Sequence, residues 1–313
     1  MSALIGAAAP DIAAAVAALR AGDLVAFPTE TVYGLGADAR NPEALRKVYS
    51  LKGRPTTHPL ILHVGSVDEL KYWVADIPPV ALKLAGRFWP GPLTLVLPRS
   101  SQVSDVLTGG QNTVAIRVPS HPVARALLAA FGGGIAAPSA NRYGRVSPTR
   151  AVHVREEFFE NLLVLEGGDC EVGLESTIVI IVDGTPRLLR PGSISRTEIE
   201  TVLGQSIEVG AGAGSPRVPG STAKHYAPQT PLELVGAGTL PTAEATVRAR
   251  GERVATLACP QGSDPATYGR ALYAELRRLD KVGASRILVE AVPESPQWDA
   301  VRDRLSRAAA AFL

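Results

Sequence analysis

The sequence predicts an α/β or α+β layer fold divided over two domains. Short runs rich in Val, Ile and Leu, bounded by Gly, Pro or Asn, alternate with helical patterns. With 46% hydrophobic and 20% charged residues, the 313-residue chain can bury a sizeable core, which excludes disorder for most of it. After about Gln205 the alternation gives way to a stretch dominated by Gly, Pro, Ser and Ala, which indicates an interdomain linker.

The elements of the first domain, residues 1–205, follow from their end signals and apolar runs. Asn41 followed by Pro42 is an N-cap with proline at the first helical position, and Gly22 is a helix stop. Helices are predicted at residues 10–21, 42–51, 122–131 and 149–159. Strands are predicted at residues 23–28, 59–64, 93–97, 113–118, 135–137, 162–165, 176–182 and 187–189.

A linker at residues 206–229 separates this domain from a small βαβ-type domain at residues 230–313. Its strands are predicted at residues 232–235, 253–258 and 286–289, and its helices at residues 243–250, 266–282 and 297–312. The first domain carries 19 basic and 19 acidic side chains, and the whole chain has a formal charge of +2. This balance excludes a global polycation, so any polyanion must be bound locally.

The cysteines and the N-terminus favour a cytoplasmic protein. Cys170 and Cys259 lie far apart and neither belongs to a paired-Cys motif, which excludes a zinc ribbon and a disulfide scaffold. The apolar N-terminus has no positively charged start and is broken by Pro10 and Asp11, so we expect a helix and not a signal or membrane segment.

The motifs of common nucleotide and hydrolase sites are missing. The sequence has no Walker phosphate loop, no H-E-x-x-H, no G-x-S-x-G and no kinase signature. A G-x-G-x-x-A match at Gly132, Gly134 and Ala137 follows a helix and precedes a strand, the reverse of a dinucleotide site, so it is interpreted as a helix stop. The histidines show no metal-ligand spacing, and a protein metal site is not expected.

Loop-like clusters rich in small hydroxyl, basic, Gly and Pro residues instead follow or end the predicted strands, where α/β proteins gather their ligands. Lys52 and Arg54 suit a multi-phosphate ligand, although their spacing alone favours two solvated cations. Thr29, Glu30 and Thr31 are interpreted as a turn. The clusters are FPTETVYGLGADA (27–39), KGRPTTHPL (52–60), WPGPLTLVL (89–97), AIRVPSHP (115–122), APSANRYGRVSPT (137–149), LESTIVI (174–180) and LLRPGSI (188–194).

Arg117 is more informative because it lies within an apolar strand. A partly buried arginine needs an anionic partner, which is either a protein carboxylate or the carboxylate of a ligand. Ser139, Asn141 and Ser147 suit phosphate or ribose contacts or a simple turn, and His63 is by default a core histidine. The residues indicate a cleft for an anionic small molecule without an obvious general base or nucleophile.

In this order, the clusters resemble the YrdC-like family of L-threonylcarbamoyladenylate synthases in its longer, two-domain form. The shared elements are FPTETVYGLG, K-G-R-P, H-P-L, W-P-G-P-L-T, I-R-V-P, P-S-A-N, E-S-T, R-P-G-S-I and the linker signature KHYAP. The resemblance implies a twisted, open mixed sheet enclosing a large positive cavity, followed by a small Rossmann-like α/β domain. It also implies a nucleotidyltransferase that converts L-threonine, bicarbonate and ATP into threonylcarbamoyl-AMP and pyrophosphate.

The product would go to a tRNA threonylcarbamoyl transferase machinery that modifies ANN-decoding tRNAs, and direct tRNA contact is not required. The resemblance assigns catalysis to Lys52, Arg54, Ser139 and Asn141, around the ATP phosphates and an Mg²⁺ ion carried by ATP. It assigns threonine binding to Thr31, His63, Arg117, Ala137 and Ser176, with Thr177 as the alternative to Ser176. The further ATP contacts are His58, Thr113, Ser147, Arg190 and Tyr226, and the linker ending in Tyr226 is expected to act as a lid.

Two other functions compete with this interpretation. An RNA-binding translation or maturation factor without catalysis needs a basic face, which the neutral first domain does not favour, although Arg142, Arg145 and Arg150 cluster locally. The related carbamoyltransferase module of hydrogenase maturation carries zinc-finger and acylphosphatase-like regions, and this chain has neither.

Overall fold

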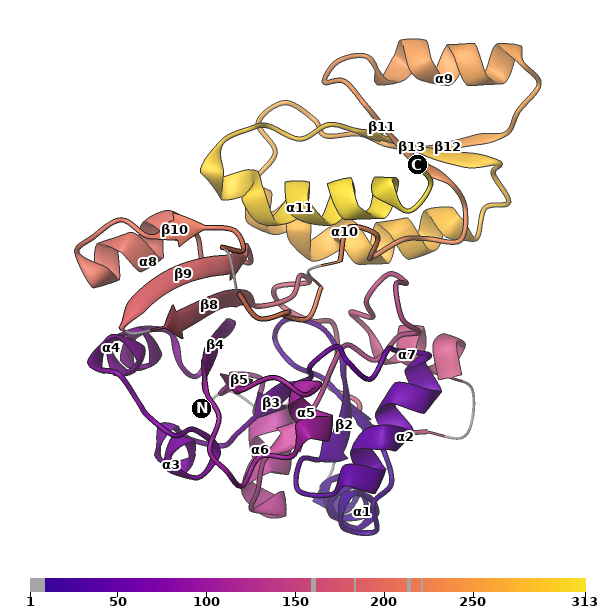
Figure 1. Ribbon diagram of the computed structural model, residues 1–313. Coiled ribbons are helices and arrows are strands. Elements are labelled where there is room, and N and C mark those ends of the chain that lie inside the picture. The colour runs from indigo at the N-terminus through magenta and orange to yellow at the C-terminus, as the bar shows by residue number, and fades with distance from the viewer. Residues whose placement is uncertain (1–8, 159–161, 183, 213–214, 221) are drawn as a thin grey trace.

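The computed structural model describes residues 9–158, 162–182, 184–212, 215–220 and 222–313, and it contains two layered α/β units (Figure 1). The strands of the first unit are β1 (Val25–Phe27), β2 (Gly34–Asp38), β3 (Ile61–His63), β4 (Leu93–Pro98), β5 (Thr113–Arg117), β6 (Ile135–Ala136), β7 (Leu163–Val164), β8 (Thr177–Val182), β9 (Thr185–Arg190) and β10 (Glu208–Val209). They form one mixed sheet in the order β10-β9-β8-β4-β5-β3-β6-β2-β1-β7. The predicted α/β class with a mixed sheet is confirmed.

Helices flank this sheet, and their caps explain where they start and stop. They are α1 (Ala9–Arg20), α2 (Pro42–Lys52), η1 (Val67–Glu69), α3 (Leu70–Trp73), α4 (Pro79–Phe88), α5 (Asp105–Thr108), α6 (Pro122–Phe131), α7 (Ala151–Phe158) and α8 (Arg196–Leu203). The Asn41 side chain accepts hydrogen bonds from the first-turn amides of α2, and Gly53 ends α2 in the left-handed conformation with φ 63°. Gly132 ends α6 with φ 71°, so the G-x-G-x-x-A match is a helix stop.

The second unit contains a three-stranded parallel sheet in the order β11-β13-β12. Its elements are β11 (Leu232–Val235), α9 (Leu240–Ala249), β12 (Val254–Leu257), α10 (Pro265–Asp280), β13 (Arg286–Glu290), η3 (Pro296–Trp298) and α11 (Asp299–Ala310). Figure 1 shows α10 and α11 on the side of this sheet that faces the first unit. The predicted βαβ arrangement is therefore present, and the second unit docks through two helices.

One interpretation from the sequence is wrong. Residues 34–38, treated as part of a loop cluster, form β2, which pairs with both β1 and β6. Glycine is usually unfavourable in strands, but a Cβ at Gly36 would lie 2.8 Å from Cε1 of Phe27 and 3.0 Å from Cγ2 of Ile135. The glycine is therefore needed for the close packing of β2 against its neighbours.

Some predicted boundaries also shift. The helix predicted at 149–159 begins at Ala151, and its last predicted residue lies outside the described residues, as do positions 213–214 and 221 of the predicted linker. The helix predicted at 243–250 begins earlier, at Leu240, and α4 and α8 lie in segments for which no element was specified. Within the described residues, no helix is both long and apolar enough to cross a membrane.

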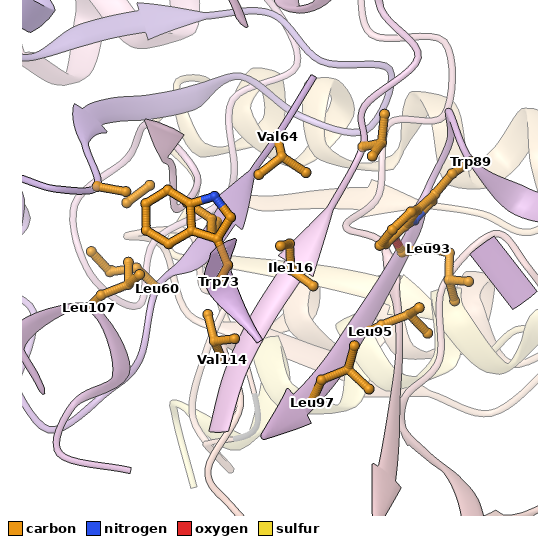
Figure 2. Packing of buried hydrophobic residues seen from close by; sticks show 14 of the residues in the cluster. Leu60, Val64, Trp73, Trp89, Leu93, Leu95, Leu97, Leu107, Val114 and Ile116 are labelled. Atoms are coloured by element: carbon orange, nitrogen blue, oxygen red, sulfur yellow. The ribbon is translucent and has the colours of Figure 1, made fainter. Parts of the chain in front are cut away.

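The main hydrophobic core lies between the large sheet and its helices (Figure 2). Alternate residues Leu93, Leu95 and Leu97 of β4 pack beside Val114 and Ile116 of β5, as expected for one face of a sheet. A second core, centred on α10 and β13, also includes Val32, Val146, Leu174 and Tyr226 from outside the second domain. The two domains therefore share buried surface, and their contact is held in place beside the cavity described below.

Candidate active site

Most of the predicted site residues line one cavity, at the place where the first domain, the linker and the second core meet. From the predicted set, the lining includes Thr31, Lys52, Arg54, His63, Arg117, Ala137, Ser139, Asn141, Ser176, Arg190 and Tyr226. They come from α2, three strands and several loops that are distant in sequence. The sheet order explains this gathering, because it places β3 beside both β5 and β6, with β2 next to β6.

Three predicted residues lie outside the lining. The ring of His58 contacts the cavity indirectly, since its Nδ1 lies 3.0 Å from the hydroxyl of Tyr143, which does line the cavity. Ser147 is fully buried and donates a 2.5 Å hydrogen bond to Oε1 of Glu175, another lining residue. Thr113 opens β5, and its buried Oγ1 has no hydrogen-bond partner among the described residues.

Lys52 and Arg54 are buried cations and not the solvated pair that their spacing alone favoured. Lys52, at the end of α2, is 3% exposed, and its Nζ donates to the carbonyl of Ser139 at 2.6 Å and to that of Asn141. Arg54 is 7% exposed and donates to the carbonyl of Pro59 at 2.7 Å. Neither forms an ion pair with any residue in the described ranges. Burial, with Arg54 alongside, lowers the pKa of Lys52.

A second part of the cavity lining, called the Arg117 end below, contains a buried ion pair. Nη2 of Arg117 lies 2.7 Å from Oε1 of Glu30, and both side chains are 3% exposed. Arg117 also donates from Nη1 to Oγ1 of Thr31 at 2.9 Å and from Nε to the carbonyl of Gly91 at 3.1 Å. Burial would raise the pKa of Glu30, but the Arg117 guanidinium outweighs it and holds that pKa below its usual value.

The predicted need of Arg117 for an anionic partner is therefore met by a protein carboxylate. Glu30 was interpreted as a turn residue, and the turn exists, because the Thr29 hydroxyl donates to the carbonyl of Val32 at 2.6 Å. Arginine has five N–H donors, and the terminal nitrogens of Arg117 retain donors beyond those used by Glu30 and Thr31. The guanidinium thus lines the cavity with donors still available to a second anion.

His63 contributes a neutral imidazole beside this pair. Burial and the neighbouring Arg117 lower the pKa of His63 to about 3, so its ring is uncharged at neutral pH. Its Nδ1 is buried without a hydrogen-bond partner among the described residues, and its ring lies edge-on to Phe27. A neutral ring can accept a hydrogen bond without adding charge beside Arg117.

Ser176, and not Thr177, lines the cavity. The Ser176 hydroxyl lies 2.7 Å from that of Thr94 and accepts a hydrogen bond from Nη2 of Arg190 at 3.1 Å. The Thr177 hydroxyl donates to the carbonyl of Ile194 at 2.8 Å. Because the Thr177 side chain is used in fixing the R-P-G-S-I segment, Ser176 is the residue of this pair that a ligand can reach.

The linker closes one side of the cavity with Pro219, Gly220, His225 and Tyr226. Tyr226 is the only non-glycine residue with positive φ in the described part of the chain, at 61°, and its buried hydroxyl has no hydrogen-bond partner there. The remaining volume is ≈ 50 Å³. Small-molecule sites usually have roughly 300–1,000 Å³, so the linker and the other lining side chains leave little free space in this conformation.

The arrangement suits anion binding and alignment more than acid–base catalysis. Among the described residues there is no group of three or more His, Cys, Asp and Glu side chains that could hold a metal ion. The uncharged side-chain oxygens of the lining are better suited to contact a cation that is already bound to phosphate. Asn141 lines the cavity, and its buried Oδ1 has no hydrogen-bond partner in the described ranges.

Several lining residues were not selected from the sequence. Glu175 and His225 belong to the quoted elements E-S-T and KHYAP, so adjacency to Ser176 and Tyr226 was a usable signal. Tyr143 lies within the P-S-A-N cluster. The role of Glu30 as a partner of Arg117 had no local signal, since the two residues meet only through the sheet.

Comparison with known proteins covers both domains. Residues 17–192 match a family model described as "Telomere recombination" (Sua5_yciO_yrdC), and residues 194–310 match "Threonylcarbamoyl-AMP synthase, C-terminal domain". The chain is 39% identical to a Pyrococcus abyssi protein named threonylcarbamoyl-AMP synthase, over 93% of this chain and 91% of the relative. A Bacillus subtilis protein of the same name is 39% identical over 96% and 93%.

A solved structure agrees with this similarity. The crystal structure of P. abyssi Sua5 complexed with L-threonine superimposes with a TM-score of 0.90 at 38% identity, covering 96% of this chain and 94% of that chain. The agreement extends over both domains and includes the segment that carries the cavity.

Proposed function

Because the chain belongs to the family of two-domain threonylcarbamoyl-AMP synthases, we propose that it condenses L-threonine, bicarbonate and ATP into threonylcarbamoyl-AMP and pyrophosphate. The observation that carries the proposal is the single cavity with two different cationic ends. Lys52, without an anionic partner in the described ranges, donates to the carbonyls of Ser139 and Asn141. Arg117 pairs with Glu30 and donates to Thr31. Two ends of different chemistry suit two anionic substrates.

The reaction requires alignment of three small molecules. The threonine amine first attacks bicarbonate to form a carbamate with loss of water, and a carbamate oxygen then attacks the α-phosphorus of ATP as pyrophosphate leaves. Arg117, with donors left over on its terminal nitrogens, would hold the threonine carboxylate. Lys52 and Arg54 would stabilise the charge that develops on the phosphates, which makes this step a nucleotidyl transfer.

A magnesium ion would enter with ATP and neutralise part of the triphosphate charge. We propose that Asn141 Oδ1 and the Ser139 hydroxyl are the neutral oxygens that this chain offers toward it, because Asn141 Oδ1 is buried without a partner in the described ranges. Glu175 also lines the cavity, but its carboxylate oxygens accept hydrogen bonds from protein donors.

Threonylcarbamoyl-AMP is a mixed anhydride that water hydrolyses, so a cytoplasmic tRNA threonylcarbamoyl transferase is the proposed consumer. Closure by the linker would exclude water from both the carbamate and the product. Tyr226 and His225 lie at the cavity, which supports the lid prediction.

The RNA-binding alternative gains no support from the local basic cluster. Arg150 forms an ion pair with Asp169, Arg145 donates to the carbonyl of Pro228, and Nη1 of Arg142 donates to the carbonyl of Leu51 at 3.4 Å. These partners compete with a nucleic-acid backbone for the same residues.

The test is pyrophosphate release from ATP by the purified chain, with the nucleotide product identified by mass spectrometry. Threonine, bicarbonate and Mg²⁺ are omitted in turn. We expect release only with all three, together with threonylcarbamoyl-AMP. Release that ignores threonine would contradict the synthase proposal. No release, together with salt-sensitive tRNA binding, would replace it with the RNA-binding one.

A further inference from the structure

A buried carboxylate joins the cavity to the second domain. Oε1 of Glu175 accepts the hydrogen bond from Ser147, and Oε2 accepts from the Tyr273 hydroxyl at 2.9 Å and from Nε of Arg304 at 2.8 Å. Tyr273 lies on α10 and Arg304 on α11, whereas Glu175 and Ser147 belong to the first domain. The Arg304 side chain is 0% exposed and that of Glu175 is 9% exposed. Two helices of the second domain thus fix a group that lines the cavity.

The same two residues also hold Tyr226. The Arg304 guanidinium carbon lies 5.2 Å from the centre of the Tyr226 ring, within range of a cation–π contact. The ring of Tyr273 stacks on the Tyr226 ring, with centroids 5.9 Å apart and an interplanar angle of 26°. Arg304 and Tyr273 therefore each contact both Glu175 and Tyr226, two residues that line the cavity.

Helix α11 also holds the linker on the N-terminal side of Tyr226. Nη1 of Arg307 donates to the carbonyl of Thr222 at 2.7 Å, and the amide of His225 donates to the carbonyl of Arg307 at 3.3 Å. Asp303 pairs with both Arg304 and Arg307 and so orients the two guanidinium groups. One face of α11 thus holds the linker at Thr222 and His225.

A buried ion pair of this kind is weak evidence for stability as such. Removing two charges from water costs several kcal/mol, and well-packed apolar residues often serve a fold equally well. What a charged, hydrogen-bonded cluster adds is one defined geometry. Here that geometry includes Ser147, Glu175 and Tyr226, and Glu175 directly precedes Ser176, which lines the cavity.

We propose that Arg304 and Tyr273 are positioning residues for the reaction, through which the second domain sets the places of Glu175 and Tyr226 in the cavity. The proposal rests on the proposed function. It assigns the second domain to the nucleotide end, because the residues that the cluster holds include Ser147 and Tyr226, two of the predicted ATP contacts.

The test compares full-length variants by their KM for ATP, KM for threonine and kcat in the pyrophosphate assay, at a temperature where melting curves show each to be folded. For Arg304→Gln we expect KM for ATP to rise about tenfold, as for loss of a charge-assisted hydrogen bond, with KM for threonine within about twofold of wild type. Arg302→Gln is the matched control, because Arg302 lies on the same helix and pairs with Asp299 outside the cluster. It should leave both KM values unchanged.

Arg304→Gln leaves Glu175 buried without its cation, so the variant could fail to fold. Tyr273→Phe avoids this because it keeps the ring that stacks on Tyr226 and removes only the hydroxyl. We expect KM for ATP to rise about threefold to fivefold in Tyr273→Phe, with little change in melting temperature.

Wild-type KM for ATP in Tyr273→Phe and in any folded Arg304→Gln would overturn the proposal, and so would equal increases in KM for both substrates. A wild-type chain that makes no threonylcarbamoyl-AMP would be a failure of the proposed function alone. In that case the Kd for ATP, measured by calorimetry on the same variants, decides the positioning role. We expect it to rise relative to wild type by the same factors as those given for KM.

Discussion

The Glu30–Arg117 and Glu175–Arg304 pairs are chemically alike, but they face the cavity in opposite ways. At the first pair the cation lines the cavity and the carboxylate lies behind it, whereas at the second pair the carboxylate lines the cavity and the cation lies behind it. The first pair lies within one domain and the second crosses the domain boundary. A buried ion pair can thus place either its cation or its carboxylate at the cavity. The two pairs differ in whether the residue behind the cavity wall comes from the same domain or from the other one.

This comparison implies a division of labour. A free substrate anion can approach Arg117 directly, since the guanidinium has donors beyond those that Glu30 and Thr31 use. Glu175 would repel a phosphate, and its oxygens are already occupied by Ser147, Tyr273 and Arg304. The first pair is suited to binding a substrate anion, and the second is suited to fixing the domains and the linker relative to one another.

The largest effect is expected at the cation that faces the cavity. Arg117→Ala should raise KM for threonine by about 100-fold, because it removes a charge-assisted contact to a buried anion worth roughly 3 kcal/mol. KM for ATP should change little. Arg117→Lys keeps the charge without the planar fork, so its KM for threonine should lie between those of wild type and Arg117→Ala. Comparable losses for both substrates would show that the ends of the cavity are not separate.

The second prediction uses pH to compare the pairs. Burial would raise the pKa of Glu175, but Arg304 and the other donors lower it to about 2 from 4.5. Since the folded pKa is depressed, the pair contributes stability above about pH 4.5 that is lost as the pH falls toward about 2, about 3 kcal/mol in total. Urea unfolding of wild type and Glu175→Gln across this range measures it, and parallel curves for the two would contradict the assignment.

Lys52 sharpens the comparison because it is a buried cation without an anionic partner in the described ranges. Lys52→Ala should raise KM for ATP by about 30-fold, or roughly 2 kcal/mol, and leave KM for threonine almost unchanged. Lys47→Ala is a matched control on the same helix, since Lys47 is exposed and pairs with Asp23. If Lys52→Ala behaved like Arg117→Ala, the two cationic ends would serve one ligand.

The smallest effect is expected for the carboxylate behind Arg117. Glu30→Gln keeps a hydrogen-bond acceptor for the guanidinium and removes one charge, so KM for threonine should rise about fivefold, or about 1 kcal/mol. Because Glu30 acts through Arg117, the double variant Glu30→Gln/Arg117→Ala should be no worse than Arg117→Ala. Additive losses, measured in the same assay, would mean that Glu30 contacts the substrate itself.

The sequence was informative where function depends on local order. The polar clusters at strand ends gather in one cavity, and the resemblance selected residues that line it, such as Ser139 and Arg190. Spacing alone could not show that Lys52 and Arg54 are buried, because a loop after a helix is usually exposed and only the fold over them removes water.

Pairs formed at long range were beyond the sequence. Glu30 follows β1 and Arg117 ends β5, and three other strands lie between β1 and β5 in the sheet, so no local pattern reports that the two residues meet. The contact of Arg304 with Glu175 depends on which face of α11 docks on the first domain, and the amphipathic pattern of α11 shows only that one face is buried. The strand at Gly34–Asp38 was missed because its glycines, read locally, indicate a turn.

The two borders of the large sheet bear on how the protein behaves at high concentration. The outermost strands, β7 and β10, are two residues long, and Glu208 places a charge on β10. Short and charged borders offer few free backbone groups to another chain, which is how natural sheets resist joining into fibrils. Leu163 in β7 and Val209 in β10 are exposed apolar residues, so mutations that lengthen either strand are the ones to avoid when preparing concentrated samples.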